Sequence, residues 1–211
     1  MHIPDGILSP AVWGASAVVS AVALARGVRY SRTKLDHRTV PVMGAMAAFV
    51  FASQMINFPL LGAAASGHLI GGALCAILFG FWPATLIMTT VVAIQAFVFQ
   101  DGGVTALGAN VLLMGILAPA VAALAHRLLR GLRVPMAASG FISAWLSVVC
   151  VALCGAGLLA LSGVIGFVPA ASALLFWHAI IGVGEGLITA VVLPFALRSS
   201  FHFAAKEGMS A

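Results

Sequence analysis

The chain has 211 residues, of which 63% are hydrophobic and only 7% carry a charge, and its mean hydropathy is +1.17. This composition excludes a soluble globular fold, because such a fold could not bury so much apolar surface, and it predicts a polytopic membrane protein. The net charge of +5 is expected to reflect the loops between spans rather than nucleic-acid binding.

The first element is a short N-terminal segment, residues 1–9, which begins Met1-His2. No Lys or Arg precedes the first apolar stretch and no clear cleavage site follows, so we do not expect a removable signal peptide. The Met1 amine, the backbone nitrogen of His2 and one imidazole nitrogen of His2 can close fused rings around one cation. Planar nitrogen donors of this kind suit Ni²⁺ or Cu²⁺ better than Zn²⁺. The alternative is a disordered start with an incidental histidine.

Seven apolar stretches follow the N-terminal segment. They cover residues 10–25, 40–56, 69–82, 84–99, 110–129, 135–161 and 170–197. We expect an all-α integral membrane protein with about seven transmembrane helices in one domain, residues 1–211, because backbone groups in lipid must bond within each segment and no stretch alternates like a barrel strand. An extracytoplasmic N-terminus places all 10 Lys and Arg residues on one side, which the positive-inside rule assigns to the cytoplasm together with the C-terminus.

The third apolar stretch is unusually short, with about 21 Å of helix for a hydrocarbon core of about 30 Å. The connection before it, residues 57–68, is mostly apolar and has no Asp, Glu, Lys or Arg. Non-helical backbone at membrane depth lines a cavity, so we expect a re-entrant loop here. His68 lies where this loop meets the short helix and could add a fourth nitrogen to the Met1-His2 chelate. A helix-start histidine bonded to a carbonyl is the alternative.

Few polar residues lie on or near the expected outer side. They are His2, Asp5, Asn57, His68, Asp101 and Asn110, with His178 and Glu185 inside the last stretch. Asp5 and Asn57 are candidates to orient the imidazoles or the terminal amine, as metal-bound histidines usually require, and Asn110 is a further candidate. Glu185 and His178 could form a proton relay, a polar layer around the metal or a packing hydrogen bond. A structural role of Glu185 is favoured over direct ligation.

Four ordered motifs resemble the CbiM/NikM family along nearly the whole chain. They are Met1-His2-Ile3-Pro4-Asp5-Gly6, Ser66-Gly67-His68-Leu69, Leu107-Gly108-Ala109-Asn110 with Met114-Gly115, and Gly184-Glu185-Gly186-Leu187. Members of this family are substrate-binding membrane subunits of energy-coupling-factor transporters for cobalt and nickel. The resemblance implies seven helices and an outward N-terminus that is inserted into the bundle. It also implies a square-planar metal held by the Met1 amine, the amide and imidazole nitrogens of His2, and the imidazole of His68.

The motifs also bear on the transported metal and on partners. Pro4-Asp5 and Gly67-His68-Leu69 look closer to nickel-type members, so Ni²⁺ is slightly favoured over Co²⁺ as the transported substrate. There is no G-x-x-x-x-G-K-[ST] loop, so we do not expect an enzyme with its own ATPase site. The resemblance implies a transmembrane coupling subunit and ATP-binding cassette ATPases as partners in the cell membrane, and the need for a small accessory membrane subunit stays open.

Two further interpretations depend on single groups of residues. The small residues Gly44, Ala48 and Ala52 form a stripe in the second stretch, which could be a face for the coupling subunit or could pack within this protein. A stand-alone proton-coupled secondary transporter, with Glu185 and His178 as the coupling pair, is the alternative function.

Overall fold

The computed structural model describes residues 1–62 and 64–198, and most of them are helical. The helices are α1 (Pro10–Lys34), α2 (Thr39–Gln54), α3 (Gly72–Phe79), α4 (Phe81–Ile94), α5 (Leu107–Asn110), α6 (Ala118–Gly131), α7 (Met136–Leu161) and α8 (Phe167–Arg198). Two π-helical segments, η1 (Gln95–Phe99) and η2 (Val111–Leu117), extend α4 and join α5 to α6. The strands β1 (Phe58–Leu60) and β2 (Ala65–Gly67) form a hairpin.

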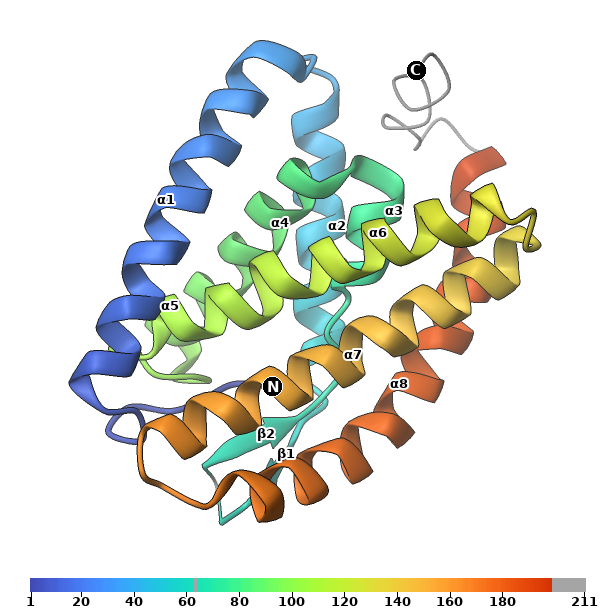
Figure 1. Ribbon diagram of the computed structural model, residues 1–211. Coiled ribbons are helices and arrows are strands. Elements are labelled where there is room, and N and C mark those ends of the chain that lie inside the picture. The colour runs from blue at the N-terminus through green and yellow to red at the C-terminus, as the bar shows by residue number, and fades with distance from the viewer. Residues whose placement is uncertain (63, 199–211) are drawn as a thin grey trace.

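The bundle has two chemically different ends (Figure 1). The α1–α2 turn, the α6–α7 turn and the end of α8 lie in the upper half of that view, and the sequence places the Lys and Arg residues of the described chain in these segments. The N-terminus, the hairpin and the α7–α8 turn lie in the lower half. The fold therefore separates the basic residues from the N-terminal segment.

The observed helices correspond to the expected apolar stretches except at the third one, and α1 continues to Lys34, beyond the expected end at residue 25. Within the described chain, five helical segments are long and apolar enough to cross a membrane, and α2 is a shorter apolar helix. The third stretch was expected to be one helix over residues 69–82, but α3 has only 8 residues, about 12 Å. Gly71 and Gly80, with φ of 80° and 84°, interrupt the helix on either side, since this backbone region favours glycine.

The expected re-entrant connection contains a β-hairpin, which the all-helical expectation missed. The register pairs Phe58 with Gly67, Pro59 with Ser66 and Leu60 with Ala65. Pro59 disfavours a helix here, and positive φ at Leu61 and Gly62 reverses the chain between the strands. Ser66 also donates its backbone N–H to the carbonyl of His2 at 3.1 Å. The N-terminal segment therefore lies directly beside β2.

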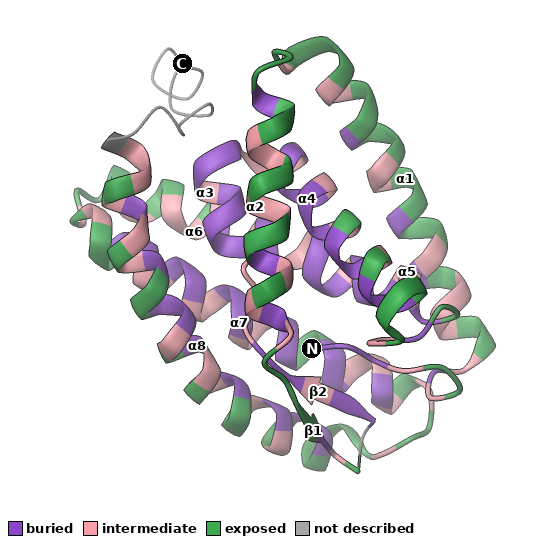
Figure 2. Cartoon of the chain, turned by 180° about the vertical axis from the view of Figure 1, so that it is seen from behind, coloured by how far each residue is buried: buried purple, intermediate pink, exposed green. Residues whose placement is uncertain are grey.

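Burial is concentrated around the N-terminal segment, α3, α4 and α7, whereas α1 and α2 expose much of their surface (Figure 2). Met1 and Ile3 are completely buried, so the N-terminus is inserted into the core of the bundle. Large apolar side chains such as Ile56 and Phe195 lie on the outside. Apolar surface of this extent suits contact with lipid and is typical of a multi-pass membrane protein.

Candidate metal centre

The N-terminal segment is held in the bundle through its backbone. Ile3 donates its N–H to Oδ1 of Asn110 at 2.8 Å, and its carbonyl accepts from Nδ2 of Asn110 at 2.9 Å. The same carbonyl accepts the N–H of Gly103 at 2.9 Å. The Met1 side chain packs against Gly155 of α7. Asn110, one of the residues expected near the metal, thus fixes the backbone of Ile3, which directly follows His2.

His68 points one ring nitrogen at the terminal amine. Its Nδ1 contacts the carbonyl of Leu69 at 2.6 Å, and a carbonyl can only accept, so Nδ1 carries the proton and Nε2 has a free lone pair. Nε2 lies directly against the amine of Met1. The amine is also 3.5 Å from Sδ of Met114. The carbonyl of Leu69 therefore orients His68 toward Met1, and a bond to a carbonyl is also what the alternative, an ordinary helix-start histidine, predicted.

The second imidazole is oriented by a side chain from η1. His2 Nε2 lies 3.0 Å from Oε1 of Gln95, an acceptor, so Nε2 carries the proton and Nδ1 has the lone pair. Nδ1 is buried and has no hydrogen-bond partner within the described chain. The ring of His2 stacks on the ring of His68, with centroids 4.4 Å apart. The backbone N–H of His2 donates to Oγ of Ser66 at 2.9 Å.

Met1, His2 and His68 thus bring four nitrogens to one buried place. Three of them, the amine and two imidazole nitrogens, have lone pairs, and the fourth, the amide nitrogen of His2, becomes a ligand on losing its proton. Such a donor set is suited to square-planar Ni²⁺ or Cu²⁺. Among the described residues, His, Cys, Asp and Glu form no cluster of three that could hold a metal ion, so the terminal amine is essential to this interpretation.

Burial keeps the nitrogen donors neutral. Desolvation lowers the pKa of the Met1 amine from 8.0 to about 4 and the pKa of His2 from 6.5 to about 3. The pKa of His68 is well below its usual value, first because of burial and then because of the nearby amine. Burial also raises the pKa of Asp101, against the opposing effect of the amine. At neutral pH the site therefore holds neutral bases, which are the forms that bind metal.

Asp5 and Asn57 were expected to orient an imidazole or the amine, but the structure gives them other partners. Asp5 accepts the backbone N–H groups of Val104 at 3.1 Å and Thr105 at 2.7 Å, which ties the N-terminal segment to the loop before α5. Asn57 donates from Nδ2 to Oδ2 of Asp101 at 2.8 Å. Gln95, rather than either of these residues, orients the His2 ring.

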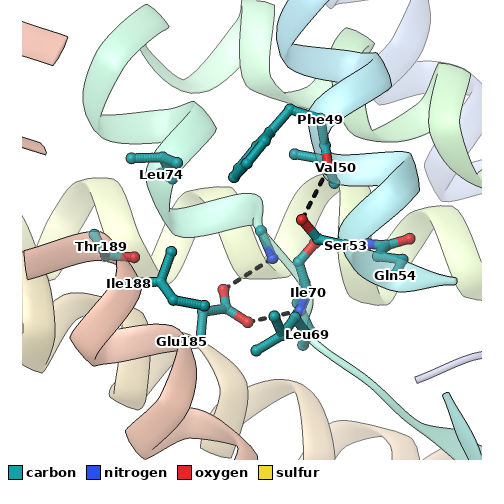
Figure 3. Close-up of a pocket in the computed structure, with 11 residues that line it drawn as sticks. Phe49, Val50, Ser53, Gln54, Leu69, Ile70, Leu74, Glu185, Ile188 and Thr189 are labelled. Carbon is teal, nitrogen blue, oxygen red and sulfur yellow. Dashed lines mark hydrogen bonds between the residues drawn. The ribbon is translucent and has the colours of Figure 1, made fainter. Parts of the chain in front are cut away.

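Glu185 of α8 lies behind the His68 loop (Figure 3). Its Oε2 accepts the N–H of Ile70 at 2.6 Å and its Oε1 accepts the N–H of Gly71 at 2.9 Å, at the start of α3. Both oxygens therefore hold the backbone that directly follows His68. This contact agrees with the structural role that was favoured for Glu185 over direct ligation.

His178 lies seven residues before Glu185 on α8. Its Nδ1 donates to the carbonyl of Leu174 at 2.9 Å, and its buried Nε2 has no partner within the part of the chain described here. The hydrogen-bonding groups of Glu185 and His178 are thus directed to different backbone segments. This arrangement does not favour the proton-relay interpretation of the pair.

Sequence reasoning missed several residues that shape the site. They are Gln95, which orients His2; Ser66, which pairs with the backbone of His2; and Met114, whose sulfur faces the amine. Asp101 was expected only as one of the outer polar residues, and the structure places its Oδ1 3.4 Å from Nδ1 of His2. Gln95 and Met114 belong to η1 and η2, and π-helical segments often occur at functional sites. Such segments have no distinct sequence pattern, and only the polarity of Gln95 inside an apolar stretch could have drawn attention to it.

The chain is similar to known metal transport proteins. The family described as "Cobalt uptake substrate-specific transmembrane region" matches residues 2–202. The cobalt transport protein CbiM of Streptomyces coelicolor is 33% identical over 209 residues, which cover 95% of this chain and 90% of that protein. A protein of Archaeoglobus fulgidus described as a fused nickel transport protein, NikMN, is 35% identical over 200 residues, which cover 92% of this chain and 65% of that protein.

A solved structure has the same fold. The crystal structure of a truncated transition metal transporter superimposes with a TM-score of 0.90 at 31% sequence identity, over 94% of this chain and 99% of that one. Sequence and structure comparisons therefore identify the same class of protein, and the names of the relatives include both nickel and cobalt.

Proposed function

The chain belongs to the CbiM family of substrate-specific transmembrane proteins for cobalt uptake, and we propose that it captures Ni²⁺ or Co²⁺ on the extracytoplasmic side of the membrane. In this proposal it is the substrate-binding component of an energy-coupling-factor transporter. A transmembrane coupling subunit and ATP-binding cassette ATPases would drive release of the metal into the cytoplasm.

The observation that carries the proposal is the convergence of Met1, His2 and His68. The carbonyl of Leu69 accepts a hydrogen bond from His68, and Oε1 of Gln95 accepts one from His2. Each imidazole is thereby fixed with its other nitrogen free in the site. Hydrogen bonds from second groups to metal-binding histidines are the usual way in which proteins set the tautomer. These two hydrogen bonds therefore support the assignment of Nε2 of His68 and Nδ1 of His2 as metal-binding nitrogens.

The donor set bears on which metal is bound. Four nitrogens in a plane favour Ni²⁺ over Co²⁺, because the coordination of Co²⁺ is more flexible. The same donors would also accept Cu²⁺. The relatives carry names for both nickel and cobalt transport. We therefore propose nickel as the slightly favoured substrate, with cobalt as the close competitor.

Two features of the bundle support the proposed partner subunits, namely its basic end and an exposed face of α2. The positive-inside rule assigns the basic end to the cytoplasm, where ATPases would act. On α2 the stripe Gly44, Ala48 and Ala52 is exposed, and a Cβ at Gly44 would meet nothing within 4 Å. The stripe is therefore free for a neighbouring helix, which supports the partner-face interpretation over packing within this protein.

The proposal is tested by calorimetric titration of Ni²⁺ and Co²⁺ into the purified chain. A variant with one glycine inserted between Met1 and His2 changes the chelate rings but keeps every side chain. We expect the native start to bind one equivalent tightly and the insertion to weaken binding at least a hundredfold, which is about 2.7 kcal/mol. A His37→Ala variant, at an exposed position between α1 and α2, is the histidine control. Equal binding by native and inserted chains would contradict the proposed site.

A further inference from the structure

An open pocket of about 200 Å³ lies on the outer side of the metal centre. Its lining includes His2, Asn57, Ser66, Gln100, Asp101 and Gly102. A water molecule occupies about 30 Å³ of liquid, so the pocket admits a cation together with part of its hydration shell. Because His2 lines this pocket, the pocket adjoins the nitrogens that are proposed to bind the metal.

Asp101 is the carboxylate of this pocket, and within the described residues only one of its oxygens accepts a hydrogen bond. Oδ2 accepts from Nδ2 of Asn57 at 2.8 Å. Oδ1 lies 3.4 Å from Nδ1 of His2, whose proton is on the other ring nitrogen because Nε2 faces Oε1 of Gln95. Two electron pairs thus face each other with no proton between them. A cation placed there relieves the repulsion and satisfies both groups.

The other outer carboxylate is used differently. Asp5 accepts hydrogen bonds from the backbone of Val104 and Thr105, so its charge is committed to holding the N-terminal segment. The Asp101 side chain is 20% exposed while the His2 side chain is only 2% exposed. An ion that comes from outside therefore reaches Asp101 before it reaches the buried nitrogens.

We propose that Asp101 provides a first binding site for the incoming divalent cation, which then moves from Oδ1 of Asp101 to Nδ1 of His2. The inference rests on the proposed function and adds a separate step to it. A carboxylate can bind a cation that keeps most of its water, and the cation needs to lose the remaining water only when the nitrogens replace it. The negative charge also raises the local concentration of cations at the pocket.

The test is stopped-flow mixing of Ni²⁺ with the full chain at low ionic strength, followed by the absorbance of the nickel complex. We expect Asp101→Asn to slow association about tenfold and to leave dissociation unchanged, because the carboxylate acts before the final complex. Asp101→Glu keeps the charge and should keep most of the rate. Asp36→Asn, which removes the same charge from the α1–α2 turn, should bind like the unmodified chain.

Several results would overturn the inference. One is an Asp101→Asn association rate equal to that of Asp36→Asn. Another is faster dissociation with a changed spectrum, which would make Asp101 a ligand of the final complex. If the asparagine variant does not fold, the test is the association rate of the unmodified chain with Ni²⁺ at increasing salt. The inference requires this rate to fall, and a rate that salt does not change would contradict it. An unmodified chain that binds no Ni²⁺ would instead contradict the proposed function itself.

Discussion

Two acceptor oxygens decide which nitrogens of His2 and His68 can bind a cation. The carbonyl of Leu69 holds the proton of His68 on Nδ1, and Oε1 of Gln95 holds the proton of His2 on Nε2. With the opposite tautomers, the nitrogens that face the site would be donors and would repel a metal ion. The choice of tautomer is therefore as important to the site as the choice of residue.

Burial of the donors predicts how many protons leave when metal binds. With pKa values of about 4 for the Met1 amine and about 3 for His2, both groups are neutral in the docked chain between about pH 5 and 7. Only the amide proton of His2 then remains to be displaced, so we expect about one proton released per metal ion. Because a proton is a product, affinity should rise about tenfold for each pH unit over this range.

Calorimetry in buffers with different ionisation enthalpies measures that proton count. A short Met-His peptide is the control, since its exposed amine and imidazole keep ordinary pKa values near 8.0 and 6.5 and must also lose protons. Two or more protons per metal in the full chain would mean that its N-terminus is not docked before the ion arrives.

Close packing against Gly103 predicts a second effect at the level of one residue. A Cβ on Gly103 would meet the backbone nitrogen of Asp5, and it would lie 2.7 Å from the carbonyl carbon of Pro4. Backbone cannot move aside as a flexible side chain can, so Gly103→Ala should displace the N-terminal segment at a cost of about 1–3 kcal/mol. We expect nickel affinity to fall at least tenfold in a titration.

The control for this change is Gly157→Ala on α7, where an added Cβ meets nothing within 4 Å. It should bind like the unmodified chain. Unchanged affinity in Gly103→Ala would show that the segment does not need this close approach for metal binding.

Secondary structure shows where sequence patterns were sufficient and where they were not. The stretch expected over residues 135–161 agrees closely with α7, Met136–Leu161, because a long uniform apolar run has only one structural solution in lipid. The hairpin was missed because its strands have three residues each, too few for an alternating pattern. Its partner, moreover, is the N-terminal segment, which is distant in sequence.

The residues proposed as ligands could be named from the sequence, but the contacts around them could not. Met1, His2 and His68 could be proposed because amine and imidazole chemistry is local to a residue, and the structure brings these three together. Gln95 and Asp101 act through tertiary contacts, which no spacing in the sequence encodes. The partners of Asp5 and Asn57 were not predicted for the same reason.

The contact between α8 and the His68 loop predicts a role for Glu185 in stability and binding. Glu185→Ala would leave the buried N–H groups of Ile70 and Gly71 without acceptors, at about 1–3 kcal/mol for each group. We expect a lower midpoint of thermal unfolding and weaker nickel binding, since His68 directly precedes this backbone. Glu185→Gln keeps one acceptor and should lose less of both.

Gly184→Ala is the neighbouring control on α8, because a Cβ there meets nothing within 4 Å. Thermal unfolding and titration are measured on all three variants. Normal binding and stability in Glu185→Ala would contradict the view that this carboxylate holds the loop.

If the exposed stripe on α2 is the partner face, one substitution there should prevent assembly with the coupling subunit and leave nickel binding intact. Ala48→Phe adds a bulky side chain to a surface on which a partner helix would need small residues. Co-purification with the transmembrane coupling subunit should be lost, whereas nickel titration should be unchanged. Ala21→Phe, on an exposed position of α1, is the matched control and should retain the partner. Loss of metal binding together with assembly in Ala48→Phe would contradict the partner-face assignment.

At the scale of the whole molecule, the proposed metal centre is separated from the basic end of the bundle. The proposed metal ligands and the outer pocket lie near the end that holds the hairpin, and the basic segments lie at the opposite end (Figure 1). Between them, α3 and the surrounding helices are closely packed and largely buried. In the proposed function, moving an ion from one end to the other therefore requires a rearrangement of the bundle, which the partner subunits would drive.

This separation predicts how the chain behaves alone in a membrane. In vesicles with an imposed proton gradient, we expect the chain to bind about one Ni²⁺ per molecule without accumulating Ni²⁺ inside, because Glu185 and His178 are hydrogen-bonded to separate backbone segments rather than arranged as a relay. Vesicles that also contain the coupling subunit and ATPases should accumulate Ni²⁺ on addition of ATP. An ATPase variant that cannot hydrolyse ATP is the control. Gradient-driven accumulation by the chain alone would instead support a proton-coupled secondary transporter, and the same assay on His178→Ala would then show whether that residue carries the coupling.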